Sequence, residues 1–260
     1  MKQTLLFDLD DTLIYCNKYF HLILEQFADE MTDWFEPHGI SRDEILRKQT
    51  EIDIAGVQVL GFKGDHFPHS FVETYRYFHH LTGRPSSERE ERLLLKLGFS
   101  VYELEVEPYP HMNETLEQLA GEGHDLHLYT GGDRKIQLNK IERMDLKRYF
   151  GDRIYIRQHK NTEALEQILR EGSFDRSATW MIGNSLRTDV LPALQCGINS
   201  VYLKQEGEWT YNVVPIEEAQ PSGAFLTLHE LAEVPPAIRQ YLMRSSGPHV
   251  SSSPTVKKPS

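Results

Sequence analysis

Two aspartates follow a hydrophobic run near the start of the chain. The segment LLFDLDDTL places Asp8 and Asp10 directly after this run, with Thr12 two residues further on. Carboxylates are costly at the end of a buried strand unless they bind a cation or take part in chemistry. They could reach one site along a continuing strand, where residues two apart point the same way, or across a turn. Both arrangements predict two acids and a hydroxyl where an open α/β sheet usually binds its ligand.

Polar residues also follow three later apolar runs. They are Thr130, Gly131 and Gly132 after LHLYT, Lys160 after RIYI, and Gly183, Asn184, Ser185 and Asp189 after ATWMIG. In a parallel sheet, all these strand ends lie on one edge. The residue types suit phosphoryl transfer: a carboxylate can attack phosphorus, and oxygen ligands suit Mg²⁺. Hydroxyl and backbone N–H groups can hold phosphoryl oxygens, and lysine supplies a compact positive charge.

Each of these features also has an ordinary structural explanation. Asp8 and Asp10 could stand in a solvated turn, and Thr130 with its glycines suits any strand-to-loop turn. Most lysines, such as Lys160, are surface charges, and Asn184 could cap a helix. The order of all four groups along the chain favours a single site over four unrelated features.

Six short apolar runs predict the strands that carry this site. They lie near residues 4, 130, 154, 183, 200 and 225 and are separated by helical patterns. Such alternation predicts an α/β fold with a Rossmann-like, doubly wound parallel sheet. Asn161 or Thr162 can cap the helix after the third run. Thr188 or Asp189 can begin the helix after the fourth, which places Pro192 in its tolerated first turn.

Residues 15–107 differ from the rest of the chain because helical patterns replace the strand runs. Ser41 and Glu44 have capping-box spacing, and Phe71, Tyr75 and Phe78 share one helical face. We therefore predict a helical domain inserted into a core of residues 1–14 and 108–246. Residues 247–260 have little to bury and are predicted to be disordered.

The amino-acid composition limits which classes of molecule the protein is expected to bind. Among its 260 residues, 39 acids outnumber 28 bases, giving a formal charge of -11. This balance disfavours binding to a nucleic acid polymer but allows a negatively charged substrate beside a local cation. No apolar run approaches the ~20 residues that span a membrane, and the N-terminus lacks a signal-peptide pattern. Cys16 and Cys196 form no close pair, so we expect reduced thiols in a cytoplasmic protein without membrane partners.

The four polar strand ends resemble the motifs of the haloacid dehalogenase-like (HAD) superfamily of hydrolases. FDLDDTL resembles the first motif, DxDxT, and LYTGG resembles the second. Lys160 is chosen as the lysine of the third motif, and IGNSLRTD resembles the fourth. The helical insert between the first two motifs is similar to the family's cap of the first type. The resemblance runs from Asp8 to Asp189 and covers most of the chain.

This resemblance implies roles for three residues in the reaction. Asp8 would be the nucleophile that forms an aspartyl-phosphate. Asp10 would protonate the leaving group as general acid and then activate water as general base. Lys160 would orient Asp8 and offset its charge. The second aspartate of the motif also favours phosphatase over dehalogenase chemistry, because a haloacid has no bridging oxygen to protonate.

The resemblance also implies a Mg²⁺ cofactor and a phosphate subsite. The metal would contact Asp8, the backbone carbonyl of Asp10, Asn184 and, directly or through water, Asp189. The expected phosphate-binding groups are those of Thr12, Thr130 and Gly131. Asn184 departs from the motif, in which an aspartate is usual. An amide oxygen can still bind Mg²⁺, but we expect weaker binding than an Asn184→Asp variant would show.

The sequence thus predicts a Mg²⁺-dependent phosphatase that acts on a small phosphorylated metabolite, such as a nucleotide or a sugar phosphate. The alternatives are a phosphomutase or phosphotransferase, and a phosphate-sensing or scaffold protein with weak turnover. Substrate selection is expected from the helical insert. Its polar candidates, individually typical of surface or packing residues, are Lys63, Asp65, His66, Arg76, His79 and His80.

Overall fold

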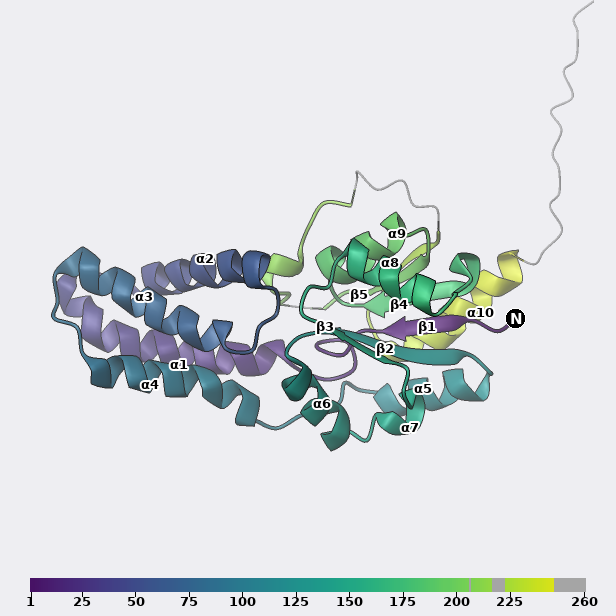
Figure 1. The fold of residues 1–260 in the computed structure, drawn as a ribbon, viewed down its shortest axis with the longest axis horizontal. Helices are drawn as coiled ribbons and strands as arrows, with labels where there is room; N and C mark the ends of the chain where they lie inside the picture. The colour runs from purple at the N-terminus through teal and green to yellow at the C-terminus, as the bar shows by residue number, and fades with distance from the viewer. Residues whose placement is uncertain (206, 217–222, 246–260) are drawn as a thin grey trace, which may run out of the picture.

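A computed structural model describes residues 1–205, 207–216 and 223–245 of the chain. In these residues, six parallel strands form one sheet in the order β3-β2-β1-β4-β5-β6 (Figure 1). The strands are β1 Thr4–Phe7, β2 Asp125–Gly131, β3 Ile154–Arg157, β4 Thr179–Gly183, β5 Asn199–Leu203 and β6 Phe225–Leu228. The predicted α/β fold class is confirmed. Residue 246 and the predicted tail at 247–260 lie outside the described residues.

Helices cover both faces of the sheet. On one face lie α5 (Met112–Gly121), α6 (Arg134–Arg143), α7 (Lys147–Phe150) and α10 (Val234–Ser245), and on the other lie α8 (Thr162–Glu171) and α9 (Leu191–Gln195). Successive side chains of β1 point to opposite faces of the sheet. Leu5 and Phe7 pack in the core on the side of α5, α6, α7 and α10, and Leu6 packs in the core on the side of α8 and α9. This double burial explains why the central strands are apolar without alternation.

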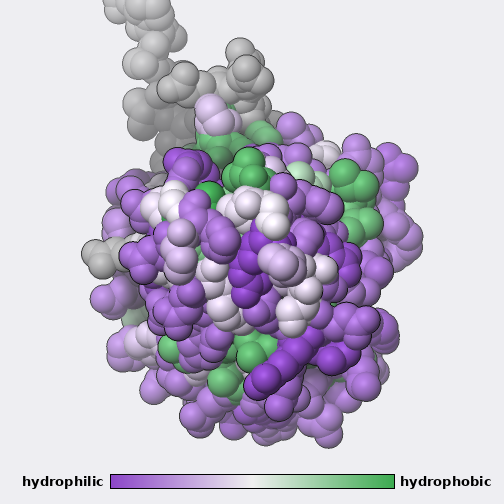
Figure 2. Space-filling model, turned by 90° about the vertical axis from the view of Figure 1, so that its left-hand side faces the viewer, coloured by the Kyte–Doolittle hydropathy of each residue, from purple (hydrophilic) through white to green (hydrophobic). Residues whose placement is uncertain are grey.

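Between β1 and β2 the chain forms a segment of four helices. These are α1 (Asn17–Phe35), α2 (Arg42–Leu60), α3 (His66–Thr82) and α4 (Glu88–Ser100), and they extend beyond the sheet on the left of Figure 1. The predicted capping box at Ser41 is present at the start of α2. The segment has its own aromatic core, in which Phe27 stacks on Phe71 with ring centroids 4.1 Å apart. Seen from this end of the molecule, hydrophilic side chains cover most of the surface (Figure 2).

The chain turns directly after β1, so Asp8 and Asp10 do not continue an extended strand. The Leu9 carbonyl accepts hydrogen bonds from the N–H groups of Leu13 at 2.9 Å and Ile14 at 3.1 Å. Asp11 has a φ of 58°. Its buried carboxylate accepts N–H bonds from Cys16 at 2.9 Å and Asn17 at 3.0 Å. Asp11, which the sequence did not single out, thereby ties this turn to the start of α1.

The segment after β4 differs from the predicted helix start. Ser185 is the capping residue, because its Oγ accepts the Thr188 N–H at 3.1 Å. A turn of π-helix spans Leu186–Val190, and α9 begins only at Leu191, with Pro192 in its first turn as predicted. Neither Thr188 nor Asp189 caps α9. Asp189 is instead buried with its carboxylate directed at a lysine.

Candidate active site

Asp8 lies at the centre of a buried polar cluster at the carboxyl ends of the strands. Lys160, in the loop between β3 and α8, places its Nζ 2.6 Å from Asp8 Oδ1. Thr12 Oγ1 donates to Asp8 Oδ2 at 3.1 Å. All three residues are buried. The turn after β1 and the loop after β3 therefore converge on one carboxylate, as the sheet topology predicts.

Asp189 joins this cluster from the turn after β4. Its Oδ1 forms an ion pair with Lys160 Nζ, and its Oδ2 accepts the Ser185 N–H at 3.0 Å. The close approach requires glycine at 183, since a Cβ there would lie 2.2 Å from Asp189 Oδ2. Lys160 thus holds two carboxylates, Asp8 and Asp189, in one buried group.

Burial dominates the electrostatics of this group. It raises the pKa of Asp8 to about 7, although the Lys160 charge lowers it; the charges of Asp189 and Asp10 raise it further. Burial would by itself lower the pKa of Lys160, but the charges of Asp189 and Asp8 outweigh it and raise this pKa. Lys160 is therefore held as an ammonium, and it is shared by two buried acids.

The oxygen donors of the cluster fit Mg²⁺. Two buried carboxylates share one ammonium, so an added cation would offset charge that the protein leaves uncompensated. Asn184 is also buried, with its Oδ1 3.4 Å from Thr12 Oγ1. Within the described residues, no cluster of three or more His, Cys, Asp or Glu side chains is arranged to bind a metal ion without other ligands. Mg²⁺ commonly uses only one or two carboxylates, with other ligands from carbonyl groups, water and phosphate.

Asp10 is held by two side chains of α6. Lys140 Nζ lies 2.7 Å from Asp10 Oδ1, and Gln137 Nε2 donates to Asp10 Oδ2 at 2.9 Å. Gln137 Nε2 also lies 2.7 Å from Thr130 Oγ1 at the end of β2. Neither residue of α6 was assigned to the site from the sequence, and Lys140 follows the second motif too closely to be preferred over Lys160 as the motif lysine. Their spacing of three, which puts them on one helical face, was the available signal.

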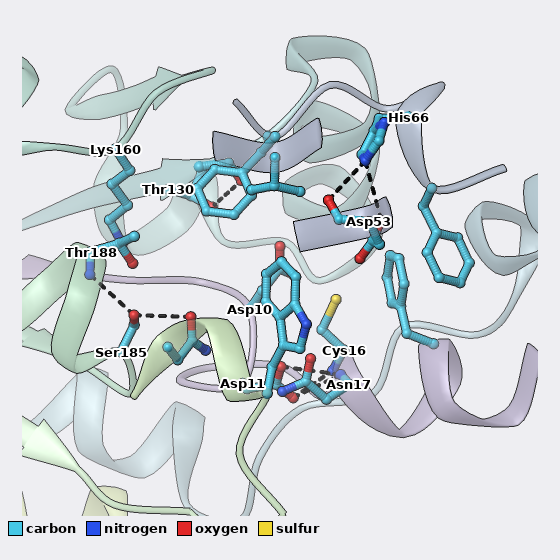
Figure 3. A pocket seen from close by; sticks show the side chains of 18 of the residues that line it. Asp10, Asp11, Cys16, Asn17, Asp53, His66, Thr130, Lys160, Ser185 and Thr188 are labelled. Carbon is cyan, nitrogen blue, oxygen red and sulfur yellow. Dashed lines mark hydrogen bonds and ion pairs between the residues drawn. The ribbon is translucent and has the colours of Figure 1, made fainter. Parts of the chain in front are cut away.

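These residues line a cavity of about 320 Å³ that lies between the strand ends and the helical segment. Figure 3 shows Lys160, Ser185 and Thr188 on one side of the cavity, and Asp53 and His66 on the other. All the predicted site residues except Thr12 line the cavity. Thr12 lies behind Asp8 and donates to it, so its hydroxyl is engaged with the carboxylate.

The polar candidates from the helical insert differ in whether they line the cavity. Lys63 and His66 line the cavity, whereas Asp65, Arg76, His79 and His80 do not. Lys63 pairs with Asp65 at 3.1 Å, and Arg76 pairs with Glu91 at 2.6 Å, so these are surface ion pairs. His66 is buried beside Asp53, a residue of α2 that the sequence did not single out.

The model of the haloacid dehalogenase-like hydrolase family matches residues 2–197. This match spans most of the chain, including every predicted site residue. The chain therefore belongs to the haloacid dehalogenase-like hydrolases, which confirms the resemblance and the expectation of a hydrolase.

Individual relatives are distant. A glyceraldehyde 3-phosphate phosphatase from Methanothermobacter thermautotrophicus is 24% identical over 214 residues, covering 79% of this chain and 87% of the relative. A haloacid dehalogenase-like family hydrolase from Xanthomonas campestris superposes with a TM-score of 0.75 at 22% identity, covering 94% and 93% of the two chains. A HAD phosphatase from Thermococcus onnurineus gives a TM-score of 0.55 at 23% identity, with coverage of 92% and 98%. These structural likenesses concern the fold, and the two phosphatase names agree with the expected phosphoric monoester hydrolase.

Proposed function

We propose that the protein is a Mg²⁺-dependent phosphatase that hydrolyses a small phosphorylated metabolite through an aspartyl-phosphate on Asp8. The observation that carries this proposal is the buried contact between Asp8 Oδ1 and Lys160 Nζ at 2.6 Å, beside a second acid held by a different lysine. The phosphatase names of a distant relative and of a structural neighbour support the same reaction class.

Asp8 would attack phosphorus and expel the alcohol, and Asp10 would protonate the leaving oxygen. In the second step, Asp10 would take a proton from water as the water attacks the phosphorus, which releases phosphate and restores Asp8. Lys160 would orient Asp8 and stabilise negative charge on the transferred group. Mg²⁺, when bound, would neutralise phosphoryl charge.

The metal ligands would come from Asp8, the Asp10 carbonyl, Asn184 and Asp189. Thr130 and the Gly131 amide would hold the phosphoryl oxygens. Thr12 would act mainly by orienting Asp8, because its hydroxyl already donates to that carboxylate.

The helical segment fits the role of a cap over this site. Residues of α1, α2 and α3 line the same cavity as Asp8, so the insert of residues 15–107 would enclose the substrate and exclude water. Residues 1–14 and 108–246 would form the catalytic core. The free thiols of Cys16 and Cys196 are compatible with a reducing compartment, and we propose the cytoplasm.

The test is hydrolysis of p-nitrophenyl phosphate with and without Mg²⁺ by the parent and by Asp8→Asn. The parent should release phosphate only with the metal. The variant should lose at least about a thousandfold in kcat, because its amide cannot form the acyl-phosphate. Trapping with beryllium fluoride should place the adduct on Asp8. Comparable turnover by both proteins would refute the role of Asp8, and no turnover by either across a metabolite panel would favour a sensor or scaffold.

A further inference from the structure

The helical segment contributes one buried carboxylate to the cavity. Asp53 lies on α2, is 8% exposed, and lines the cavity together with Asp8 and Asp10. In Figure 3 it lies across the cavity from Lys160. Burial raises the pKa of Asp53 to about 6, although the nearby His66 lowers it. A buried carboxylate is costly unless it is paired or binds a ligand.

His66 leaves much of this carboxylate free. Its Nε2 lies 2.9 Å from the backbone carbonyl of Asp53 and 3.5 Å from Oδ1. A carbonyl can only accept, so the Nε2 hydrogen is directed at the backbone. Within the described residues, His66 is the one side chain that pairs directly with the Asp53 carboxylate, and the charge of Asp53 also raises the pKa of Tyr102, which lines the same cavity. The carboxylate therefore keeps capacity to accept hydrogen bonds from a ligand.

His66, the first residue of α3, packs tightly against α2. The imidazole lies directly against the helix backbone at Gly56, where a Cβ would come within 1.9 Å of its Cε1. His66 is itself only 7% exposed. The Asp53–His66 pair is thus a packed feature of the cavity wall, unlike the surface pair of Lys63 and Asp65.

The cations around the cavity are already paired. Lys160 contacts Asp8 and Asp189, Lys140 contacts Asp10, and Lys63 contacts Asp65. Among the described residues that line the cavity there is no further lysine and no arginine. A second acidic group on a substrate would therefore find no unpaired lysine or arginine and would face the carboxylate of Asp53.

Apolar side chains of the helical segment line the same cavity as Asp53. They are Phe20, Leu24, Val57, Phe62 and Phe67. Such walls suit a carbon skeleton, while the few polar groups among them set its orientation. With about 320 Å³ of space, the cavity accommodates a small alcohol attached to the phosphate.

We infer that Asp53 binds the alcohol part of the substrate through a hydroxyl or ammonium group. The substrate class is then a phosphate monoester of a small alcohol that carries such a hydrogen-bond donor and no second acidic group. This inference rests on the proposed phosphatase function, and it assigns specificity to Asp53 in addition to the chemistry at Asp8.

The test compares kcat/KM for glycerol 3-phosphate and phosphoethanolamine with kcat/KM for 3-phosphoglycerate, which carries a second acid. The ratio of two substrates on one preparation does not depend on how much of a variant is folded. The full chain with Mg²⁺ should prefer each of the first two esters by at least about tenfold. In Asp53→Asn this preference should fall at least about tenfold, because repulsion of the acid and the charged acceptor are both lost.

Asp43→Asn is the matched control, since Asp43 is an exposed residue of the same helix. It should keep the parent's ratios. Turnover of p-nitrophenyl phosphate by Asp43→Asn should match that of the parent once normalised to folded protein.

The outcomes separate the two proposals. If the parent cleaves p-nitrophenyl phosphate but Asp53→Asn keeps the parent's substrate ratios, the assignment of Asp53 is wrong and the phosphatase function stands. A parent that prefers 3-phosphoglycerate would overturn the substrate class in the same way. Failure of the parent to cleave any ester, p-nitrophenyl phosphate included, would remove the function on which the inference rests.

Discussion

The Asp8 carboxylate is subject to two opposing effects, burial and pairing with charged or polar groups. Burial makes its charge expensive, while Lys160 at 2.6 Å and the Thr12 hydroxyl at 3.1 Å stabilise that charge. Because Lys160 is shared with Asp189, its single charge compensates only part of the cluster. A Mg²⁺ ion would complete the compensation, so metal affinity should follow the number of negative charges that the cluster contains.

Asn184 provides the test of that relation. Asn184→Asp adds a carboxylate where Asn184 Oδ1 lies 3.4 Å from Thr12 Oγ1. We expect Mg²⁺ to bind about tenfold more tightly to the variant, since the added charge strengthens attraction at the site. Isothermal titration of Mg²⁺ without substrate measures this directly. The metal-free variant should also melt at a lower temperature than the parent, because a third buried carboxylate joins the cluster.

Asn139→Asp serves as the control, because Asn139 is an exposed residue of α6 outside the cavity. It should leave Mg²⁺ affinity as in the parent. If Asn184→Asp also bound Mg²⁺ no more tightly than the parent, Asn184 would not belong to the metal shell.

At the scale of whole elements, α6 fixes the orientation of the Asp10 side chain. The helix begins at the Asp133 cap, whose carboxylate accepts the Lys135 N–H at 2.9 Å. From this start, Gln137 and Lys140 fall on the face that meets the turn after β1. Their two contacts to Asp10 fix a carboxylate that would otherwise be free to rotate in that turn.

Lys140→Met should therefore impair the step that depends on Asp10. We expect kcat to fall about tenfold or more with a smaller change in KM, because general acid–base catalysis commonly contributes a hundredfold or more. The loss should be larger for an alkyl ester such as glycerol 3-phosphate than for p-nitrophenyl phosphate, whose leaving group needs less protonation. Steady-state kinetics on both substrates measures the difference. Lys135→Met changes an exposed lysine of the same helix and should leave kcat unchanged; equal losses in both variants would contradict the positioning role of Lys140.

Strand positions can be predicted from the sequence, whereas the directions in which helix faces point cannot. Apolar runs of four to seven residues identify the strands, and parallel topology then brings Asp8, Thr130, Lys160 and Asp189 to one edge without any knowledge of packing. The positions of Gln137, Lys140 and Asp53 depend on the direction in which a helix face points once it has packed. That direction is a tertiary property, so these residues looked like ordinary polar positions. The start of α9 was mispredicted for a related reason: Asp189 resembles a helix cap locally, but the buried Lys160 provides a stronger partner.

At the scale of the whole molecule, separate hydrophobic cores support the sheet and the helical segment, and the walls of the cavity are partly polar and partly apolar. The sheet core and the aromatic core of α1–α4 are distinct clusters, and the cavity lies where the two parts meet. No helix in the described part of the chain is long and apolar enough to cross a membrane. Among the described residues, the buried side chains of the sheet core that contains Leu5 and Phe7 do not line the cavity, so a variant there can change folding stability with little effect on the cavity.

His127 in β2 illustrates this separation through the pH dependence of stability. Its ring stacks on Tyr155 with centroids 6.0 Å apart and meets Phe174 edge-on at 4.8 Å. Burial, followed by the charge of Arg153, lowers the pKa of His127 to about 4, although Asp125 raises it. Between its ordinary pKa of 6.5 and this value, the unfolded chain binds a proton that the folded protein does not. The contribution of His127 to the free energy of unfolding must therefore fall as the pH falls through this window.

His127→Phe removes this proton while keeping an aromatic ring in the core. From pH 7 to pH 5, the parent should lose on the order of 1 kcal/mol more of its unfolding free energy than the variant does. Urea titrations at each pH measure the two slopes in metal-free protein. His38→Phe, at an exposed position, should show the parent's slope. Parallel slopes for the parent and His127→Phe would mean that His127 titrates alike in the folded and unfolded chain. We expect the slopes to diverge while p-nitrophenyl phosphate hydrolysis at pH 7 is unchanged. In that case, β2 stabilises the sheet through His127 and contributes to the cavity through its carboxyl end at Thr130 and Gly131.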